Sequence, residues 1–403
     1  MQAYQIQSGQ KIAGLERVQR QSTPLAAHEV RVRVHAVSLN YRDLMIADGS
    51  YLSSGDGPVI PASDGAGEVI EVGAGVTRLR VGDRVAASFF PDWISDAPTP
   101  QVTSRALGAV TNGMLAEEVV LHEQAWVTIP AHMDYVEAST LPCAGVTAWN
   151  SLFVDGGLRA GDSVLLLGTG GVSVWALQIA KAAGLRAIIT SSSDEKLERA
   201  RALGASATIN YNRTPEWQDE VLRLTAGRGV DLVLEVGGQG TLSRSIRSAR
   251  MGGTIAIIGG VSGFGGELDP FALIGGAKRL SGIFVGSRSM LEELSRFTEL
   301  TALRPVVDRV FPFAQAGEAY AHLERAGHFG KVVIEVARSA GRAFYQAPAG
   351  RSYRPAGCCL DRDQQIGIEQ LVFLFAVPCI AARIAGHARG ADAIVEAVMQ
   401  MAV

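Results

Sequence analysis

A glycine-rich turn, G-T-G-G-V at residues 168–172, has the spacing best suited to binding a charged ligand. An uninterrupted apolar run at residues 164–167 precedes this turn, and a helical pattern at 175–183 follows it. A second apolar run at 187–190 completes the pattern. A buried strand, a glycine turn, a helix and a second strand in this order predict a βαβ unit.

Each glycine of this turn suits the binding of a pyrophosphate. Gly168 permits a tight turn, Gly170 lets the pyrophosphate approach the backbone, and Gly171 begins a helix whose free N–H groups attract anions. Ser173 replaces the third glycine of the usual motif, which we expect to affect only how closely the helix packs. The sequence thus predicts a dinucleotide site formed by Gly168, Thr169, Gly170, Gly171 and Val172.

Hydroxyl groups at the end of the second strand indicate which dinucleotide binds. A carboxylate at this position binds the ribose hydroxyls of NADH and repels the 2′-phosphate of NADPH. Here the position holds Ser191, followed by Ser192, and Lys196 lies within reach. Asp194 and Glu195 make the local charge mixed, and the alternative for the serines is a plain polar loop. We predict NADPH as the cofactor, with NADH disfavoured and Ser191, Ser192 and Lys196 near the 2′-phosphate.

The elements after the βαβ unit continue to alternate. The sequence predicts helices at residues 196–203, 216–224 and 241–248 and strands at 207–209, 232–235 and 254–258. This alternation predicts an α/β fold with a doubly wound parallel sheet. Gly237 and Gly259 follow two of these strands at their carboxyl ends, where such sheets bind ligands. We predict both as cofactor contacts, although each is equally well explained as a tight turn.

The region before the dinucleotide fold has a different pattern. Short strands punctuated by glycine are predicted at residues 30–37, 67–72, 84–87 and 115–120, which indicates a compact β-barrel over residues 1–129. The Pro, Ser and Thr content of residues 89–109 predicts a surface loop. A closing strand is predicted at 331–336, and residues 339–403, which contain Arg but no Lys, form an appended tail for which we expect partial disorder.

Composition excludes several classes of partner. The net charge of −3 and the absence of a basic block argue against nucleic acid and anionic membrane surfaces. No apolar run reaches the roughly 18 residues that span a bilayer, and the first residues lack the pattern of a secretion signal. The four cysteines show no disulfide framework. We therefore expect a cytoplasmic protein without membrane or nucleic-acid partners.

Several sequence words together resemble those of the medium-chain dehydrogenase/reductase superfamily. They include S-L-N-Y-R-D-L at 38–44, P-A-S-D-G-A-G-E-V at 61–69, L-P-C-A-G-V-T-A-W at 141–149 and H-F-G-K-V-V-I at 328–334. The chain looks most like the zinc-independent quinone oxidoreductase branch, which includes zeta-crystallin-like proteins. The resemblance implies a GroES-like catalytic domain at 1–129 and 287–338 around a Rossmann domain at 130–286, with the nicotinamide between them. It also implies cofactor contacts at Thr147 and Tyr211 and a homodimer.

The sequence departs from the zinc-dependent members of this superfamily at the metal ligands. Asn40 stands where the first cysteine ligand would be, and Ser63 and Asp64 stand where a His-Glu pair would be. Only Cys143 matches a ligand position, and residues 89–109 lack the cysteines of a structural zinc lobe. Because catalytic zinc needs three protein ligands, we predict no metal and interpret Cys143 as a small packed residue near the nicotinamide.

The cofactor carries the hydride chemistry, so the protein must position the acceptor and stabilise the charge that grows on its oxygen. The resemblance places Asn40 and Tyr41 at the nicotinamide, and both can donate a hydrogen bond. We predict both as catalytic residues, with Tyr41 polarising the substrate; the alternative for Tyr41 is an aromatic wall of the pocket.

These features predict a zinc-independent, NADPH-dependent oxidoreductase that reduces a quinone or an α,β-unsaturated carbonyl. One alternative is a metal-free alcohol dehydrogenase or aldehyde reductase, and another is a non-catalytic NADPH-binding sensor or structural protein. A strand at residues 282–285, expected at the edge of the Rossmann sheet, supports the predicted homodimer because such edges invite pairing.

Overall fold

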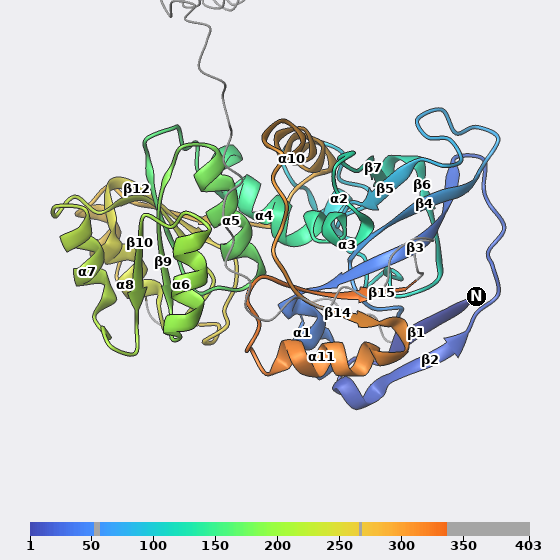
Figure 1. Ribbon diagram of the computed structural model, residues 1–403, viewed down its shortest axis with the longest axis horizontal. Helices are drawn as coiled ribbons and strands as arrows, with labels where there is room; N and C mark the ends of the chain where they lie inside the picture. Colours follow the sequence, from blue (N-terminus) through green and yellow to red (C-terminus); the bar gives the residue numbers. More distant parts are fainter. Residues whose placement is uncertain (52–56, 266–267, 337–403) are drawn as a thin grey trace, which may run out of the picture. The chain divides into compact units, whose positions relative to one another are not determined.

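The computed structural model describes residues 1–51, 57–265 and 268–336 (Figure 1). The tail predicted at 339–403 lies outside the described residues. Within the described ranges, no helix has the length and apolar character needed to span a membrane.

A six-stranded parallel sheet forms the dinucleotide fold, and all five of its neighbouring pairs are parallel. In the order in which they lie in the sheet, its strands are β10 (Ala207–Asn210), β9 (Arg186–Ser191), β8 (Ser163–Leu166), β11 (Val230–Glu235), β12 (Ala249–Ile257) and β13 (Arg279–Gly282). The chain order reverses between β8 and β11, as in Rossmann folds, where ligands bind at the carboxyl ends beside this point. The predicted doubly wound sheet is confirmed.

Helices cover both faces of this sheet, which explains the uninterrupted apolar run in β8. Leu166 belongs to a core shared with Trp175 of α5, whereas Leu165 belongs to a second core with Trp217 of α7 and Ile246 of α8. Neither face of β8 therefore meets water. The helices of this fold are α5 (Gly171–Ala182), α6 (Asp194–Ala202), α7 (Trp217–Leu224), α8 (Leu242–Ser248) and α9 (Pro270–Ile274).

The second large sheet has the order β14-β15-β3-β4-β5-β7, with β6 paired to β3, and it forms the GroES-like part of the fold. Its strands are β3 (Glu29–Leu39), β4 (Asp64–Val72), β5 (Arg84–Ala87), β6 (Glu118–His122), β7 (Trp126–Thr128), β14 (Val307–Pro312) and β15 (Lys331–Glu335). A separate hairpin joins β1 (Gln2–Ile6) to β2 (Leu15–Gln19). β15 pairs antiparallel with β3, with Val332 opposite Leu39. This pairing brings the last strand of the described chain beside the first strand of this sheet.

Further α-helices are α1 (Tyr41–Asp48), α2 (Pro100–Thr103), α3 (Tyr135–Ala138), α10 (Arg288–Thr301) and α11 (Ala316–Glu324). α10 has 14 residues, and its Leu291 and Leu294 belong to the core that contains Trp175 of α5. Between the two sheets runs a helical segment with two wide π-helical turns, η3 (Leu141–Gly145) and η4 (Asn150–Val154), on either side of α4 (Val146–Trp149). Such turns are rare and are found mostly at functional sites.

Two predictions about elements were wrong in part. The edge strand predicted at 282–285 lies at Arg279–Gly282, because the backbone turns at Val285, whose φ is 53°. Residues 89–109 are not a plain surface loop, because Phe89, Phe90 and Trp93 are buried at its start.

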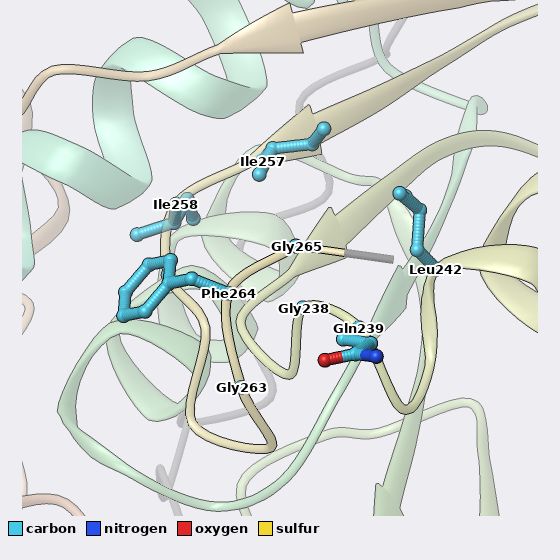
Figure 2. Close-up of a pocket in the computed structure, with 9 residues that line it drawn as sticks. Gly238, Gln239, Leu242, Ile257, Ile258, Gly263, Phe264 and Gly265 are labelled. Carbon is cyan, nitrogen blue, oxygen red and sulfur yellow. The ribbon is translucent and has the colours of Figure 1, made fainter. Parts of the chain in front are cut away.

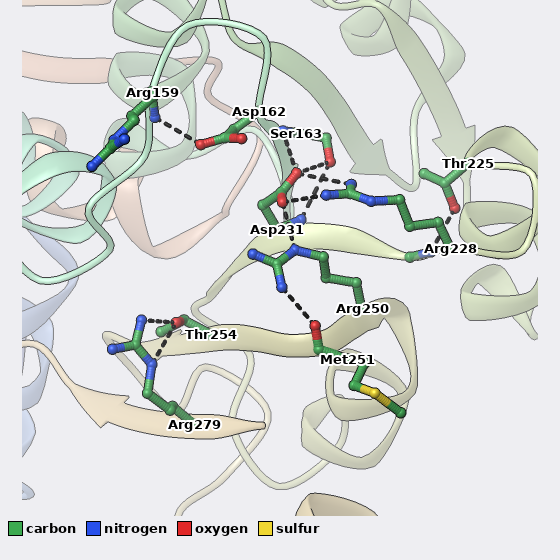
Figure 3. A network of polar contacts seen from close by, with 11 residues as sticks. Arg159, Asp162, Ser163, Thr225, Arg228, Asp231, Arg250, Met251, Thr254 and Arg279 are labelled. Carbon is green, nitrogen blue, oxygen red and sulfur yellow. Dashed lines mark hydrogen bonds and ion pairs between the residues drawn. The ribbon is translucent and has the colours of Figure 1, made fainter. Parts of the chain in front are cut away.

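Asp231 stabilises the amino-terminal end of the sheet, which is opposite to the glycine turn (Figure 3). Its carboxylate accepts hydrogen bonds from the backbone and hydroxyl of Ser163 and from the guanidinium groups of Arg228 and Arg250. Burial raises the pKa of Asp231, but these donors outweigh it and hold the pKa well below its ordinary value. This network ties the amino-terminal ends of β8, β11 and β12 together.

Candidate functional site

The glycine turn after β8 leaves open space above it. Gly168 has a φ of 72°, and its N–H donates to Thr190 Oγ1 at 3.2 Å. A Cβ added at Gly168 or at Gly170 would meet no atom within 4 Å. Ser173 is buried and donates to the carbonyl of Leu167 at 2.7 Å, which fixes the first turn of α5. The turn thus presents the free N–H groups of a 12-residue helix to open space, as an anion site requires.

The end of β9 brings two of the predicted cofactor contacts, Ser191 and Tyr211, together. The N–H of Tyr211 donates to the carbonyl of Ser191 at 3.1 Å, and the side chain of Tyr211 is 40% exposed. The Ser191 hydroxyl accepts from the N–H of Ser193 at 3.3 Å. Ser192 is exposed, and its carbonyl accepts from Asn212 Nδ2. Both Ser191 and Tyr211 therefore border the place predicted for the 2′-phosphate.

Asp194 and Lys196 in this region both have partners within the chain. The Asp194 carboxylate accepts from Asn210 Nδ2 at 2.8 Å and pairs with Arg213. Lys196 Nζ donates to the carbonyl of Ala326 at 3.1 Å, and burial lowers the pKa of Lys196. Lys196 thus points toward Ala326 in this structure, and Arg213 offsets the charge of Asp194.

A buried carboxylate organises the loop after β11. Glu235 Oε1 accepts from the N–H groups of Gly237 and Gly238 at 2.6 and 3.0 Å and from Thr241 Oγ1 at 2.7 Å. Its other oxygen accepts from Ser245. A Cβ added at Gly237 would lie 2.3 Å from Thr241 Oγ1, so this position requires glycine. Glu235 therefore fixes the loop in which Gly237 was predicted to contact the cofactor.

A pocket of about 210 Å³ opens beside this loop at the carboxyl ends of β11 and β12 (Figure 2). Its apolar walls come from Leu242, Ile257, Ile258 and Phe264. The predicted contact Gly259 lines it as well. An apolar pocket at this edge of a Rossmann sheet is suited to a flat ring of a dinucleotide.

A second set of polar residues is buried between β3, α1, β4 and β15. Lys331 is 3% exposed, and its Nζ donates to the carbonyl of Leu39 at 2.6 Å and to Asn40 Oδ1 at 2.5 Å. Because lysine only donates, this contact orients the Asn40 amide with its Nδ2 away from Lys331. The stem of Lys331 lies against the glycine turn: a Cβ added at Gly171 would be 2.6 Å from Lys331 Cδ. This polar set therefore borders the predicted dinucleotide site.

Two carboxylates belong to the same buried set. Asp64 Oδ1 accepts from Ser63 Oγ at 2.7 Å, and its Oδ2 accepts from the N–H of Cys143 at 3.1 Å. Burial raises the pKa of Asp64, although Lys331 and the nearby Asn40 amide act to lower it. Asp43 accepts from the N–H of Asn40 at 2.7 Å. Burial raises the pKa of Asp43 to about 6.

The residues at the family's metal-ligand positions make other contacts in this chain. Asn40 Oδ1 is occupied by an ammonium group, and both oxygens of Asp64 accept hydrogen bonds from Ser63 and Cys143. Burial raises the pKa of the Cys143 thiol. Over the described ranges, no group of three or more His, Cys, Asp or Glu side chains is placed to hold a metal ion.

The other predicted residues lie around this set. Tyr41 begins α1 and is 48% exposed, and no hydrogen bond within the described residues involves its hydroxyl. Thr147 is buried on α4, Val172 is half-buried on α5, and Thr169 accepts from the N–H of Gly330 at 3.1 Å. The structure thus brings Asn40 into the buried set and places Tyr41 at its surface. The individual roles of these residues stay predictions.

An aromatic cluster borders Cys143. Phe89, Phe90 and Trp93 pack together, and Cys143 and Val285 pack against them. The half-exposed Phe284 lies on Phe90, with ring centroids 4.8 Å apart. These rings form an apolar wall beside the buried polar residues.

Sequence reasoning missed Lys331 and Glu235. Lys331 stands within the word H-F-G-K-V-V-I, where a charge at the start of an otherwise apolar strand was the available signal. Glu235 likewise ends the apolar run of β11. A charge at the edge of a buried strand indicates a group with a specific partner.

Two family models match this chain. The model described as "Alcohol dehydrogenase GroES-like domain" matches residues 26–131, and that described as "Zinc-binding dehydrogenase" matches residues 171–299. The first match lies in the GroES-like part of the fold and the second in the dinucleotide fold.

Individual relatives extend over most of the chain. A zinc-type alcohol dehydrogenase-like protein of Schizosaccharomyces pombe is 44% identical over 314 residues, which is 76% of this chain and 91% of the relative. The solved structure of an NAD-dependent alcohol dehydrogenase is 35% identical, with a TM-score of 0.76 over 84% of this chain and 100% of that one. A quinone oxidoreductase of Pseudomonas syringae is 27% identical, with a TM-score of 0.71 over 83% of this chain and 99% of that one.

Proposed function

Because this chain belongs to the medium-chain dehydrogenase/reductase superfamily, we propose that it reduces quinones or α,β-unsaturated carbonyls with NADPH and without zinc. The chain is an oxidoreductase that depends on a nicotinamide cofactor. The proposal concerns its metal independence, its acceptor and its choice of nicotinamide.

The observation that carries the proposal is the buried ammonium of Lys331 against Asn40, at the residues that correspond to metal ligands in zinc enzymes. Reduction of a quinone or an enone places negative charge on the acceptor oxygen. A fixed positive charge in a dry region stabilises that oxygen more strongly than it would in water. The positive charge of Lys331, acting through Asn40, thus favours negative charge on the acceptor oxygen. In zinc-dependent members of the family, the metal ion provides this positive charge.

Each residue of the site then has a role. The bound cofactor supplies the hydride. The donors Asn40 and Tyr41 hydrogen-bond the acceptor oxygen, and Lys331 orients Asn40. The wall of Phe90 and Phe284 excludes water and favours flat, apolar acceptors.

The choice of NADPH is supported by the end of β9. A serine, Ser191, stands where a carboxylate would bind the ribose of NADH, and Tyr211 lies beside it. The nearby Asp194 is paired with Arg213, which weakens its repulsion of a 2′-phosphate. Lys196 reaches this phosphate by exchanging the carbonyl of Ala326 for a phosphate oxygen.

A second candidate function is the metal-free interconversion of alcohols and aldehydes. It is favoured by the relatives of 44% and 35% identity described above, which carry alcohol dehydrogenase names. In this reaction the carbonyl is not conjugated, so Asn40, Tyr41 and Lys331 would have to stabilise the charge on its oxygen in place of a Lewis acid.

We also propose a homodimer that pairs through β13. This strand is the last in the order of the six-stranded sheet, and an unpaired edge favours association with a second copy. Light scattering at micromolar concentration should give twice the monomer mass, and a monomer mass would contradict the proposal.

A panel assay tests the proposed function. NADPH and NADH oxidation are measured against a benzoquinone, a naphthoquinone, an aliphatic enone and an aldehyde, together with the Kd of each cofactor. We expect turnover of quinones or the enone with NADPH, and tenfold or more weaker NADPH binding in Lys196→Ala with NADH binding unchanged. Preferential turnover of the aldehyde would favour the second candidate, and no turnover with any acceptor would contradict both.

A further inference from the structure

We propose that Asn150 is a positioning residue that holds the backbone at Val285 in a strained, left-handed conformation, ready to receive the nicotinamide end of the cofactor. This inference rests on the proposed function, because it assigns the nicotinamide to the carboxyl ends of β12 and β13.

Val285 is unusual among the residues with positive φ. Its φ is 53°, whereas a β-branched side chain strongly disfavours this region. The other non-glycine residues of positive φ in the described ranges are Ala, Lys and Asp, and none of these is β-branched. Strained backbone of this kind persists only where surrounding contacts enforce it, and it gathers at ligand sites.

The contact that enforces it comes from η4. Asn150 is 7% exposed, and its Nδ2 donates to the carbonyl of Val285 at 2.9 Å across 135 residues of sequence. The wide turn of η4 begins at Asn150. Gly286 follows, where an added Cβ would lie 2.5 Å from Val146 Cγ1 and 2.7 Å from Met290 Sδ. The hydrogen bond from Asn150 and the close packing at Gly286 thus both restrict the loop after β13.

This loop lies where the second half of a dinucleotide must end. The glycine turn follows β8 and the ribose position follows β9, so the other half of the molecule extends over β11, β12 and β13. The N–H of Ile283 donates to the carbonyl of Ile257, which joins the loop to the wall of the apolar pocket. Val285 also packs against the aromatic cluster with Cys143. The loop therefore borders both the ring pocket and the buried polar set.

Two backbone N–H groups of this loop are candidate hydrogen-bond donors to the cofactor. Among the described residues, no backbone hydrogen bond uses the N–H of Phe284 or of Val285. The amide group of a nicotinamide ring accepts and donates hydrogen bonds that such backbone groups match. Without the hydrogen bond from Asn150, the backbone of Val285 would relax toward negative φ, and the peptide groups on either side of it would rotate. The cost of re-forming the strained loop would then appear as weaker binding of the nicotinamide half.

The test compares Asn150→Leu, which removes the donor at similar volume, with Asn150→Leu combined with Val285→Gly. Glycine adopts positive φ without strain, so with glycine at position 285 the loop no longer needs the hydrogen bond from Asn150. Dissociation constants are measured for NADPH and for 2′,5′-ADP, which lacks the nicotinamide. We expect Asn150→Leu to weaken NADPH about tenfold and 2′,5′-ADP less than twofold, and we expect Val285→Gly to restore NADPH binding.

Ala302→Gly is the matched control, because Ala302 also has positive φ, 51°, but ends α10. We expect it to leave the effect of Asn150→Leu unchanged. Equal weakening of both ligands, or rescue by Ala302→Gly as well as by Val285→Gly, would show a general structural role and overturn the inference. If the unaltered protein bound NADPH but reduced no acceptor, the proposed function would fail while these binding measurements would still decide the role of Asn150. If it bound no NADPH, both would fail.

Discussion

The substitution Asp43→Asn should change how the stability of the protein depends on pH. Asp43 is 1% exposed, and burial raises its pKa from 3.8 to about 6, although Arg42 and Lys331 oppose this rise. Because the folded protein then binds the proton more tightly than the unfolded chain, the contribution of Asp43 is greatest below about pH 4. It is lost as the pH rises through 6. The difference in pKa corresponds to about 3 kcal/mol.

Asparagine stays neutral and retains an oxygen that can accept from the N–H of Asn40. Urea unfolding at pH 4.0 and at pH 7.5 measures the free energy of unfolding of both proteins. Relative to the unaltered protein, Asp43→Asn should gain about 2 kcal/mol between the two pH values, because part of the effect is already lost at pH 4.0. This difference does not depend on any constant cost of the substitution. Asp48→Asn is the control for the loss of an acid from the same helix, because Asp48 is exposed. If the difference between Asp43→Asn and the unaltered protein stayed constant within about 0.5 kcal/mol, Asp43 would not be the buried acid described above.

Two further substitutions test the residues that the sequence did not reveal. Lys331→Met leaves Asn40 Oδ1 and the carbonyl of Leu39 without their donor, so we expect a loss of about 1–3 kcal/mol in urea unfolding and a kcat at least tenfold lower. An unchanged kcat would show that Lys331 has no part in polarising the acceptor. Glu235→Gln replaces a carboxylate that accepts from Gly237, Gly238 and Thr241, so the Kd for NADPH should rise about tenfold. A Kd within twofold of the original would mean that this loop does not contact the cofactor.

The parts of the fold that sequence predicts well are those whose signals are local. The apolar run of β8 and the glycines after it lie within ten residues, and a strand covered on both faces needs no alternation to be recognised. The alternation of strands and helices that follows predicts the doubly wound sheet, and the structure confirms it. The strand β14 had no such signal, because it contains Asp308 and Arg309 and ends at Pro312.

The candidate site depends on contacts that no local pattern contains. Lys331 and Asn40 are 291 residues apart, and they meet only because β15 pairs with β3. Positive φ at Val285 contradicts the preference of its own side chain, so sequence reasoning placed an extended strand there. Lys196 lies within reach of the predicted phosphate, but its orientation toward Ala326 depends on the segment before β15. Local patterns thus predict a cofactor site, and long-range pairing decides which residues surround it.

The central claim is hydride transfer to a conjugated acceptor without zinc, and metal removal tests it most directly. The purified protein is treated with a strong chelator, its metal content is measured, and NADPH oxidation with a quinone and with an enone is followed on the same sample. We expect less than about 0.1 zinc per chain and a kcat within twofold of the untreated protein, because Lys331 and Asn40 take the role of the metal. Loss of activity on chelation, restored by added Zn²⁺ at one ion per chain, would contradict the claim.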